Sequence, residues 1–230
     1  MTLSNVFGDM RHTLFAAALL VAAVPALANH EVKHEFQQGI SAAGIRRVVV
    51  DIPAGDVAIR NGASGQLVIR GHASREYDGT DRQEKNQKIV DDVSAGFTVN
   101  NEEAIVRRRF GPNAQGWRAE KFTGFHVIIE VPPGVSLDLG TKYGDVNIDG
   151  TFGDVIVDMR AGDLNVRTPR ANVRELSASC RVGDVTTNLG HEIIERSGVF
   201  PGTTRWEKAD GSSRLKLHVT AGDIDVKLTQ

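Results

Sequence analysis

The sequence predicts an all-β fold, a solenoid-like stack of short strands of the β-helix or β-roll type with a short irregular or helical excursion. Three observations predict it: a recurring Gly-Asp-(Val/Ile/Leu)-x-apolar segment, apolar alternation after each Gly-Asp pair, and 24 glycines among 230 residues. Each copy is typical of a turn that leads into a short strand, and such units stack because one unit alone cannot bury its apolar face. The copies begin at Gly55-Asp56, Gly144-Asp145, Gly153-Asp154, Gly162-Asp163, Gly183-Asp184 and Gly222-Asp223.

The first 28 residues predict a signal peptide, residues 1–28, ahead of a single domain at 29–230. Met10-Arg11-His12 supplies a basic start, residues 13–28 are apolar, and small residues precede the expected cleavage before Asn29. The start codon is Met1 or Met10. We therefore expect an exported protein, periplasmic or at the cell surface and extracellular. An uncleaved anchor is the alternative, although the apolar stretch is short for a spanning helix, and no later run is long enough.

Three apolar runs between residues 45 and 71, at 48–52, 57–59 and 67–69, predict strands joined by tight turns. Residues 72–120 break the pattern and are predicted to be the excursion, an insertion or an outward-facing segment. Within it, residues 81–93 predict a short surface helix, and residues 97–99 and 104–110 predict an irregular hairpin.

Regular alternation returns at 125–131 and restarts at 135–139 after a Pro-Pro-Gly stop. The aspartates of the repeats are then separated by 9, 9, 21 and 39 residues. A coil of about 18 to 21 residues fits these gaps if one copy has decayed within 192–206. We expect Gly to supply positive φ in each turn and Asp to accept local backbone N–H groups. A calcium-loaded β-roll is the alternative, but its repeats carry several glycines each.

Residues 131–139 (VPPGVSLDL), followed by Tyr143-Gly144-Asp145-Val146 and its further copies, resemble the DUF4097 putative-adhesin family over about residues 40–230. In that family a V-P-x-G-V-x-L-x-L segment leads into a run of G-D-I/V repeats. The resemblance implies a β-solenoid of short stacked strands that is often exported. It implies no established biochemical activity.

The composition of the chain limits the classes of partner that it is expected to bind. The chain has 27 Lys+Arg and 29 Asp+Glu, so its formal charge of -2 gives no field that favours nucleic acid. The single cysteine, Cys180, excludes an intramolecular disulfide, and alternation places it on an apolar face as a buried thiol. We expect no cofactor.

His30-Glu31-Val32-Lys33-His34 matches the two-histidine zincin motif by letter. Zinc ligation by this motif needs a helix, whereas Val32, His34 and Phe36 alternate with charged residues as in a strand. On a strand the two histidines stand about 13 Å apart, so one ion would not bind both. We expect no metal site, with adventitious metal binding by a flexible tail as the alternative. His191 begins a similar but incomplete pattern that predicts a surface loop.

The densest cluster of positive and aromatic residues lies in the predicted excursion. We interpret it as a candidate surface for an envelope protein or an acidic glycan, with an ordinary solvated hairpin as the alternative. The cluster comprises Arg107, Arg108, Arg109, Trp117 and Arg118.

The sequence therefore predicts an exported, non-catalytic, adhesin-like domain of the cell envelope, a scaffold or binding module and not an enzyme. One alternative is an envelope-stress or regulatory module that binds a specific protein. The other is a polysaccharide-active enzyme on a β-helix, which would recruit carboxylates together with Arg160 or Lys142. Its candidate carboxylates are Asp138, Asp149, Asp158 and Asp225.

Overall fold

The computed structural model describes residues 30–77, 82–115, 124–189, 195–197, 202–208 and 210–230. The predicted signal peptide, Trp117, Arg118 and His191 lie outside these residues. Strands form two large sheets, and the described residues contain one α-helix, α1 (Gln83–Asp91). The predictions of a mostly β fold and of a short helix within 81–93 are confirmed.

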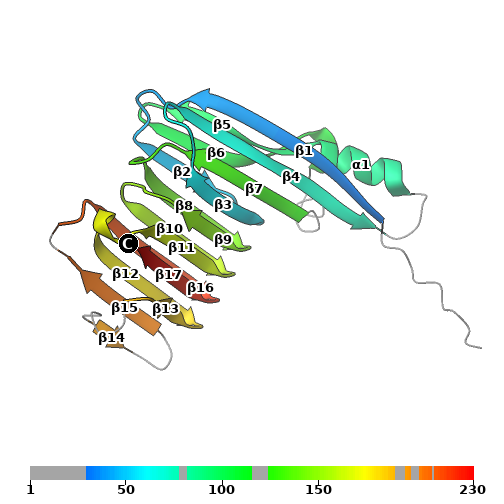
Figure 1. Cartoon of the computed structure of the whole chain (residues 1–230). Coiled ribbons are helices and arrows are strands. Elements are labelled where there is room, and N and C mark those ends of the chain that lie inside the picture. Colours follow the sequence, from blue (N-terminus) through cyan, green and yellow to red (C-terminus); the bar gives the residue numbers. More distant parts are fainter. Residues whose placement is uncertain (1–29, 78–81, 116–123, 190–194, 198–201, 209) are drawn as a thin grey trace, which may run out of the picture.

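Each sheet continues from one end of the molecule to the other (Figure 1). Sheet A has the order β1 (His30–Ser41), β4 (Gln66–Tyr77), β7 (Gly124–Val131), β3 (Asp56–Asn61), β9 (Val146–Asp149), β11 (Leu164–Pro169), β17 (Ile224–Thr229) and β13 (Val185–Thr187). Sheet B has the order β14 (Glu195–Ser197), β15 (Gly202–Glu207), β12 (Val173–Val182), β16 (Ser213–Ala221), β10 (Val155–Ala161), β8 (Ser136–Tyr143), β2 (Arg47–Asp51), β6 (Glu103–Phe110) and β5 (Val93–Asn100). Two short 3-10 turns, η2 (Pro112–Ala114) and η3 (Arg170–Asn172), complete the described elements.

In the middle of the molecule the chain passes from sheet B to sheet A in one unit after another. We call each such unit a coil: the five coils are β2–β3, β8–β9, β10–β11, β12–β13 and β16–β17. Neighbouring coils pair in parallel in both sheets.

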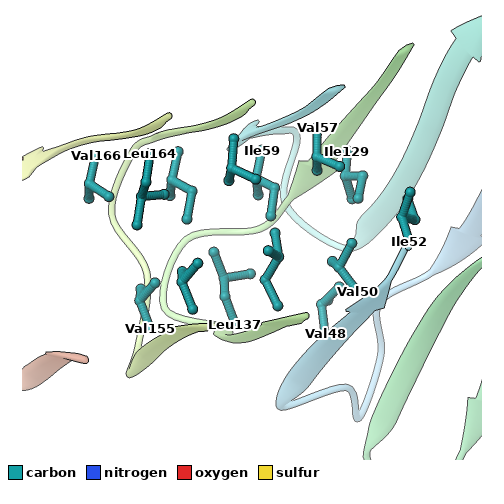
Figure 2. Close-up of a cluster of buried hydrophobic side chains, with 14 of the residues drawn as sticks. Val48, Val50, Ile52, Val57, Ile59, Ile129, Leu137, Val155, Leu164 and Val166 are labelled. Atoms are coloured by element: carbon teal, nitrogen blue, oxygen red, sulfur yellow. The ribbon is translucent and has the colours of Figure 1, made fainter. Parts of the chain in front are cut away.

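The core lies between the two sheets, because alternation along each strand turns every second side chain inward. Figure 2 shows the two facing rows, with Ile59 and Leu164 from sheet A opposite Leu137 and Val155 from sheet B. These side chains are at most 2% exposed. The apolar alternation after the Gly-Asp pairs therefore contributes to both rows of the core, because the Gly153 copy leads into sheet B whereas the Gly162 copy leads into sheet A.

A column of glycines stacks at one corner, where the chain passes from sheet B to sheet A. Gly144, Gly162 and Gly222 have φ of 122°, 126° and 135°, values that favour glycine. A Cβ at Gly162 would overlap the carbonyl oxygen of Gly144, and a Cβ at Gly222 would overlap that of Gly162. Glycine is therefore required twice over, by backbone conformation and by the close approach of the next coil.

The aspartates that follow these glycines form a second column. Asp145 Oδ1 accepts the backbone N–H of Asp163 at 2.9 Å, and Asp163 Oδ1 accepts that of Asp223 at 3.0 Å. The column continues to Asp56 at one end and Asp184 at the other. The predicted local acceptor role is corrected, because each carboxylate accepts the N–H of a neighbouring coil. These hydrogen bonds stabilise the stacking of the coils and fix their register.

Gly153-Asp154 lies at the opposite corner, where the chain enters sheet B. Gly153 is absent from the positive-φ glycines of the described residues, so its place in the repeat needs no left-handed turn. Asp154 accepts the backbone N–H of Arg214 at 2.9 Å and binds its guanidinium at 2.6 and 3.1 Å.

The order of the coils corrects the prediction that one copy of the repeat has decayed within residues 192–206. Asp184 stacks directly on Asp223, 39 residues later, because the last coil lies between β10–β11 and β12–β13. No copy has decayed between them: of residues 192–206, the described ones form β14 and β15, which pair antiparallel at the end of sheet B.

The hairpin predicted at 97–99 and 104–110 is confirmed, although it is regular, and much of residues 72–120 belongs to the sheets and not to an excursion. β5 and β6 form a hairpin of eight consecutive pairs that completes sheet B, and β4 extends to Tyr77 in sheet A. α1 lies against β1, where Gln87 Nε2 donates to the Lys33 carbonyl at 3.3 Å. Gln38 Oε1 accepts the N–H of Phe97 at 3.1 Å and so links β1 to β5. These contacts cover β1 and β5, the outer strands of the two sheets at this end of the molecule, which would otherwise favour edge-to-edge association.

We expect Gly162→Ala to lower the free energy of unfolding by about 2–4 kcal/mol, because Cβ strains a left-handed backbone and overlaps the next coil. Urea denaturation monitored by circular dichroism measures the change. Gly140→Ala is the matched control, since nothing lies within 4 Å of a Cβ there. An equal loss in both variants would contradict the role of the glycine column.

Candidate functional site

The three predicted arginines lie side by side on β6 but do not form one surface. Alternation directs Arg107 and Arg109 to the outer face of sheet B and Arg108 toward sheet A. Arg107 Nε binds Asp51 Oδ2 at 2.9 Å, and Arg109 Nη2 donates to the Phe97 carbonyl at 2.8 Å. Arg108 lies over the rings of Phe110 and Phe125, at 4.9 and 4.6 Å from their centroids. Each arginine thus has an intramolecular contact, and their proposed partners Trp117 and Arg118 are not described.

The two zincin-like histidines lie on β1, a strand and not a helix. The His30 ring stacks on Tyr77 with centroids 5.6 Å apart, and His34 Nδ1 lies 3.6 Å from Asp91 Oδ1 of α1. Across the described ranges, no group of three or more His, Cys, Asp or Glu side chains is arranged to hold a metal ion.

The carboxylates considered for a polysaccharide enzyme divide between the two outer faces. Asp138 and Asp158 belong to β8 and β10 of sheet B, whereas Asp149 and Asp225 belong to β9 and β17 of sheet A. Asp158 is the member that lies next to Arg160 and Lys142, around a hollow in sheet B.

Gly140 forms the floor of this hollow. It lies in β8 between Asp51 of β2 and Asp158 of β10, its register partners on either side. Space is open within 4 Å of the position where a Cβ would stand, so the missing side chain leaves a gap in an otherwise continuous row. We call this the Gly140 hollow; it is lined by Asp51, Pro53, Gly140, Thr141, Lys142, Asp158, Arg160 and Thr220.

The charged groups around the Gly140 hollow are incompletely compensated. Asp51 is paired with Arg107, but Lys142, Arg160 and Asp158 form no ion pair with any described residue. All three side chains are exposed. The Gly140 hollow therefore presents a carboxylate acceptor beside ammonium and guanidinium donors, with the Thr220 hydroxyl at its side.

A polar pair continues this row beyond Asp158. His218 of β16 is the register partner of Asp158, and Ser179 Oγ lies 3.0 Å from His218 Nδ1. Both side chains are half-buried on the outer face of sheet B. Backbone N–H groups here belong to the sheet ladders, so the row offers hydrogen-bonding capacity and not the preorganised donors of an oxyanion hole.

A histidine pair lies on the outer face of sheet A. The rings of His72 and His126 stack with centroids 4.8 Å apart, and His126 Nδ1 lies 2.9 Å from Asp56 Oδ2. Burial, and then the nearby Lys33 and His126, lower the pKa of His72. Asp56 Oδ1 also accepts the Asp145 N–H, so this pair adjoins the end of the aspartate column.

Cys180 is 1% exposed, on the predicted inward face of its strand. Its Sγ donates to the Gly222 carbonyl at 2.8 Å, and burial raises the pKa of the thiol. These contacts fit the predicted structural thiol, because thiolate formation is disfavoured.

Sequence reasoning identified Lys142, Arg160 and Asp158 but missed Asp51, Gly140 and Thr220. These residues meet only because parallel strands align them across coils. Gly140 carried one unused signal: it interrupts an alternating strand without a turn residue beside it, which marks a gap or a close approach.

We expect acid to destabilise the protein in part through His72. Its native pKa lies below the ordinary 6.5, so the unfolded chain binds the proton more readily. The free energy of unfolding therefore falls as pH drops from 6.5 through the native pKa, and the contribution of His72 is fully lost below it. His72→Gln should reduce this fall, measured by urea denaturation across the pH range. His30→Gln is the control; an unchanged pH profile in His72→Gln would contradict the expectation.

Comparison with known proteins gives only distant likenesses. No protein-family model matches the chain, and no curated protein matches it. It is similar to a solved structure described as a "putative cell adhesion protein" from Clostridium sporogenes, at 14% identity and TM-score 0.47, covering 86% of this chain and 100% of that one. A "putative adhesin" from Parabacteroides distasonis has 9% identity and TM-score 0.24, with 84% and 97% covered. Another from Bacteroides fragilis has 8% identity and TM-score 0.26, with 85% and 97% covered. Likenesses at this level carry no argument about this chain.

Proposed function

We propose that this chain is an exported, non-catalytic, adhesin-like β-solenoid module of the cell envelope that binds a neutral glycan at the Gly140 hollow. The observation that carries the proposal is the set of uncompensated donors and acceptors around an open gap in sheet B. Export is proposed from the basic and apolar pattern of residues 10–28, and membership of the DUF4097 family from the V-P-x-G and Gly-Asp segments.

A polyhydroxylated ligand suits this surface because each sugar hydroxyl both donates and accepts. Asp158 accepts hydrogen bonds, whereas Lys142 and Arg160 donate them. Asp158 borders the hollow on one side of Gly140, and Asp51, on the other side, is paired with Arg107. Unpaired groups of both signs suit a ligand that donates and accepts hydrogen bonds and carries no net charge of its own. Hydrogen bonds to charged groups contribute about 1.5–3 kcal/mol each, enough for a few contacts to bind a sugar.

The rigidity of the platform supports the same function. The Gly140 hollow is formed by strands β2, β8, β10 and β16, which are neighbours in sheet B and pair in parallel. The backbones of paired strands are held at a fixed spacing of about 4.8 Å, so the points from which these side chains extend are fixed. A preorganised surface loses less entropy when it binds.

A polysaccharide hydrolase is the second candidate, favoured by one observation. Asp51 and Asp158 flank Gly140 on strands two spacings apart, so their backbones stand about 10 Å apart, whereas inverting glycosidases hold their two carboxyl groups about 6.5–9.5 Å apart. The ion pair of Asp51 with Arg107 and the exposure of Asp158 favour binding over acid catalysis. Incubating the purified domain with each oligosaccharide that it binds, and looking for shortened products, distinguishes the two functions.

Binding to an array of neutral oligosaccharides, followed by calorimetry on each positive sugar, tests the proposal. We expect Lys142→Ala/Arg160→Ala and Asp158→Ala each to weaken binding about 10- to 100-fold, because each removes charged hydrogen-bonding groups. Gly140→Val should also weaken binding, since its side chain fills the gap.

The matched control is Asp149→Ala/Arg167→Ala, on the outer face of sheet A. It removes one exposed carboxylate and one exposed guanidinium without touching the Gly140 hollow. Equal weakening in the control, or full binding by all three hollow variants, would exclude this site. Binding of no neutral sugar would favour the alternative of a specific protein partner.

A further inference from the structure

The last coil occupies a slot inside the stack. β16 pairs in parallel with β10 on one side and β12 on the other, and β17 pairs in the same way with β11 and β13. β12 and β13 make no strand pair with β10 or β11. Among the described strands, therefore, coil β12–β13 and the β14–β15 hairpin join the stack through β16 and β17.

The entrance of the slot has specific polar contacts. Asn172 Nδ2 donates to the Phe152 carbonyl at 2.8 Å, on the side of β10, and also contacts Ser213 Oγ at 3.2 Å. Ser213 Oγ donates to the Asn172 carbonyl at 2.9 Å, while Asp154 binds Arg214 through backbone and guanidinium. These hydrogen bonds and the ion pair are specific for Ser213 and Arg214 at the start of β16.

Specific hydrogen bonds also hold the segment at the glycine corner, between β16 and β17, and at the end of β17. Asp163 and Asp184 hold Asp223 between them through the aspartate column. Asn188 then binds the backbone of Leu228 twice, accepting its N–H at 2.9 Å and donating to its carbonyl at 2.8 Å. Between these contacts six apolar side chains of the segment are at most 4% exposed, namely Leu215, Leu217, Val219, Ile224, Val226 and Leu228.

We propose that this slot is also an interaction surface for a second copy of the chain, whose segment 212–229 fills it by exchange. The slot and the segment are identical in every copy, so an exchanged pair of chains makes the same strand pairs and polar contacts as a single chain. The coil that forms the outer wall of the slot precedes the segment in the sequence. Before the segment is in place, no strand pair joins coil β12–β13 to β10 or β11, so the segment of another copy competes to join them according to protein concentration.

Exchange is detected by a disulfide across the slot. Ile156 and Lys216 are register partners on the outer face of sheet B, and Ile156 is 40% exposed. Neighbouring strands lie about 4.8 Å apart, within the Cα range that a disulfide spans. Chains carrying Ile156→Cys alone and chains carrying Lys216→Cys alone are unfolded together, refolded at a series of concentrations, oxidised and run on a non-reducing gel. We expect a covalent heterodimer whose share rises in proportion to protein concentration.

Four comparisons make the outcome decisive. The double variant Ile156→Cys/Lys216→Cys should form the disulfide within one chain, and Asp158→Cys with His218→Cys provides a second register pair. Ile156→Cys mixed with Lys227→Cys should give no heterodimer above background, because Lys227 lies on the same segment but in sheet A. Wild type, with Cys180 buried, sets the background. Intrachain disulfides without a concentration-dependent heterodimer from either register pair would overturn the proposal, as would equal cross-linking with Lys227→Cys.

Discussion

The close approach of successive coils at the glycine corner is the constraint on which the rest of the structure depends. The carbonyl oxygen of Gly144 occupies the space where residue 162 would carry a Cβ, and the same relation holds between Gly162 and Gly222. Because backbone lies directly on backbone, the coils have one register. The aspartate column follows from it, since a carboxylate one residue later reaches the N–H of the next coil. Like-charged carboxylates about 4.8 Å apart repel one another, and a hydrogen bond from a backbone N–H to an ionised carboxylate offsets that cost.

A fixed register decides what each sheet face presents. Inward positions align apolar side chains from both sheets into the core seen in Figure 2. Outward positions align polar residues into rows, so that a side chain missing from one strand leaves a gap bordered by the same position on two neighbours. The Gly140 hollow is such a gap, and Asp51 and Asp158 border it at the same register position on the two neighbouring strands. The glycine at this one register position thus creates the candidate binding site on the face of the sheet.

The predictable part of the fold was local. Turn chemistry and alternation predicted the strands around Gly144 and Gly162, because each unit specifies its own corner and its own inward face. Coil order was not predictable from spacing, since a gap of 39 residues between Asp184 and Asp223 fits either two coils or a detour through a hairpin. The candidate site was partly predictable: Lys142, Arg160 and Asp158 stand out as charges on outward strand positions. Asp51 and Thr220 could not be assigned to it, because only the pairing of distant strands brings them to β8 and β10.

The order of the coils connects the candidate site to the completion of the fold. Thr220 lines the Gly140 hollow and lies on β16, the strand that fills the slot, whereas Gly140 and Asp158 belong to coils on one side of it. The Gly140 hollow is therefore complete only once the last coil has been inserted. In an exchanged pair of chains each hollow would contain Thr220 from one copy and Lys142, Asp158 and Arg160 from the other. Exchange preserves the strand register, so it leaves the geometry of the hollow unchanged while joining two binding sites in one assembly. Two linked sites bind a surface that displays many copies of a ligand more tightly than one site does, because the second contact forms at a high effective concentration.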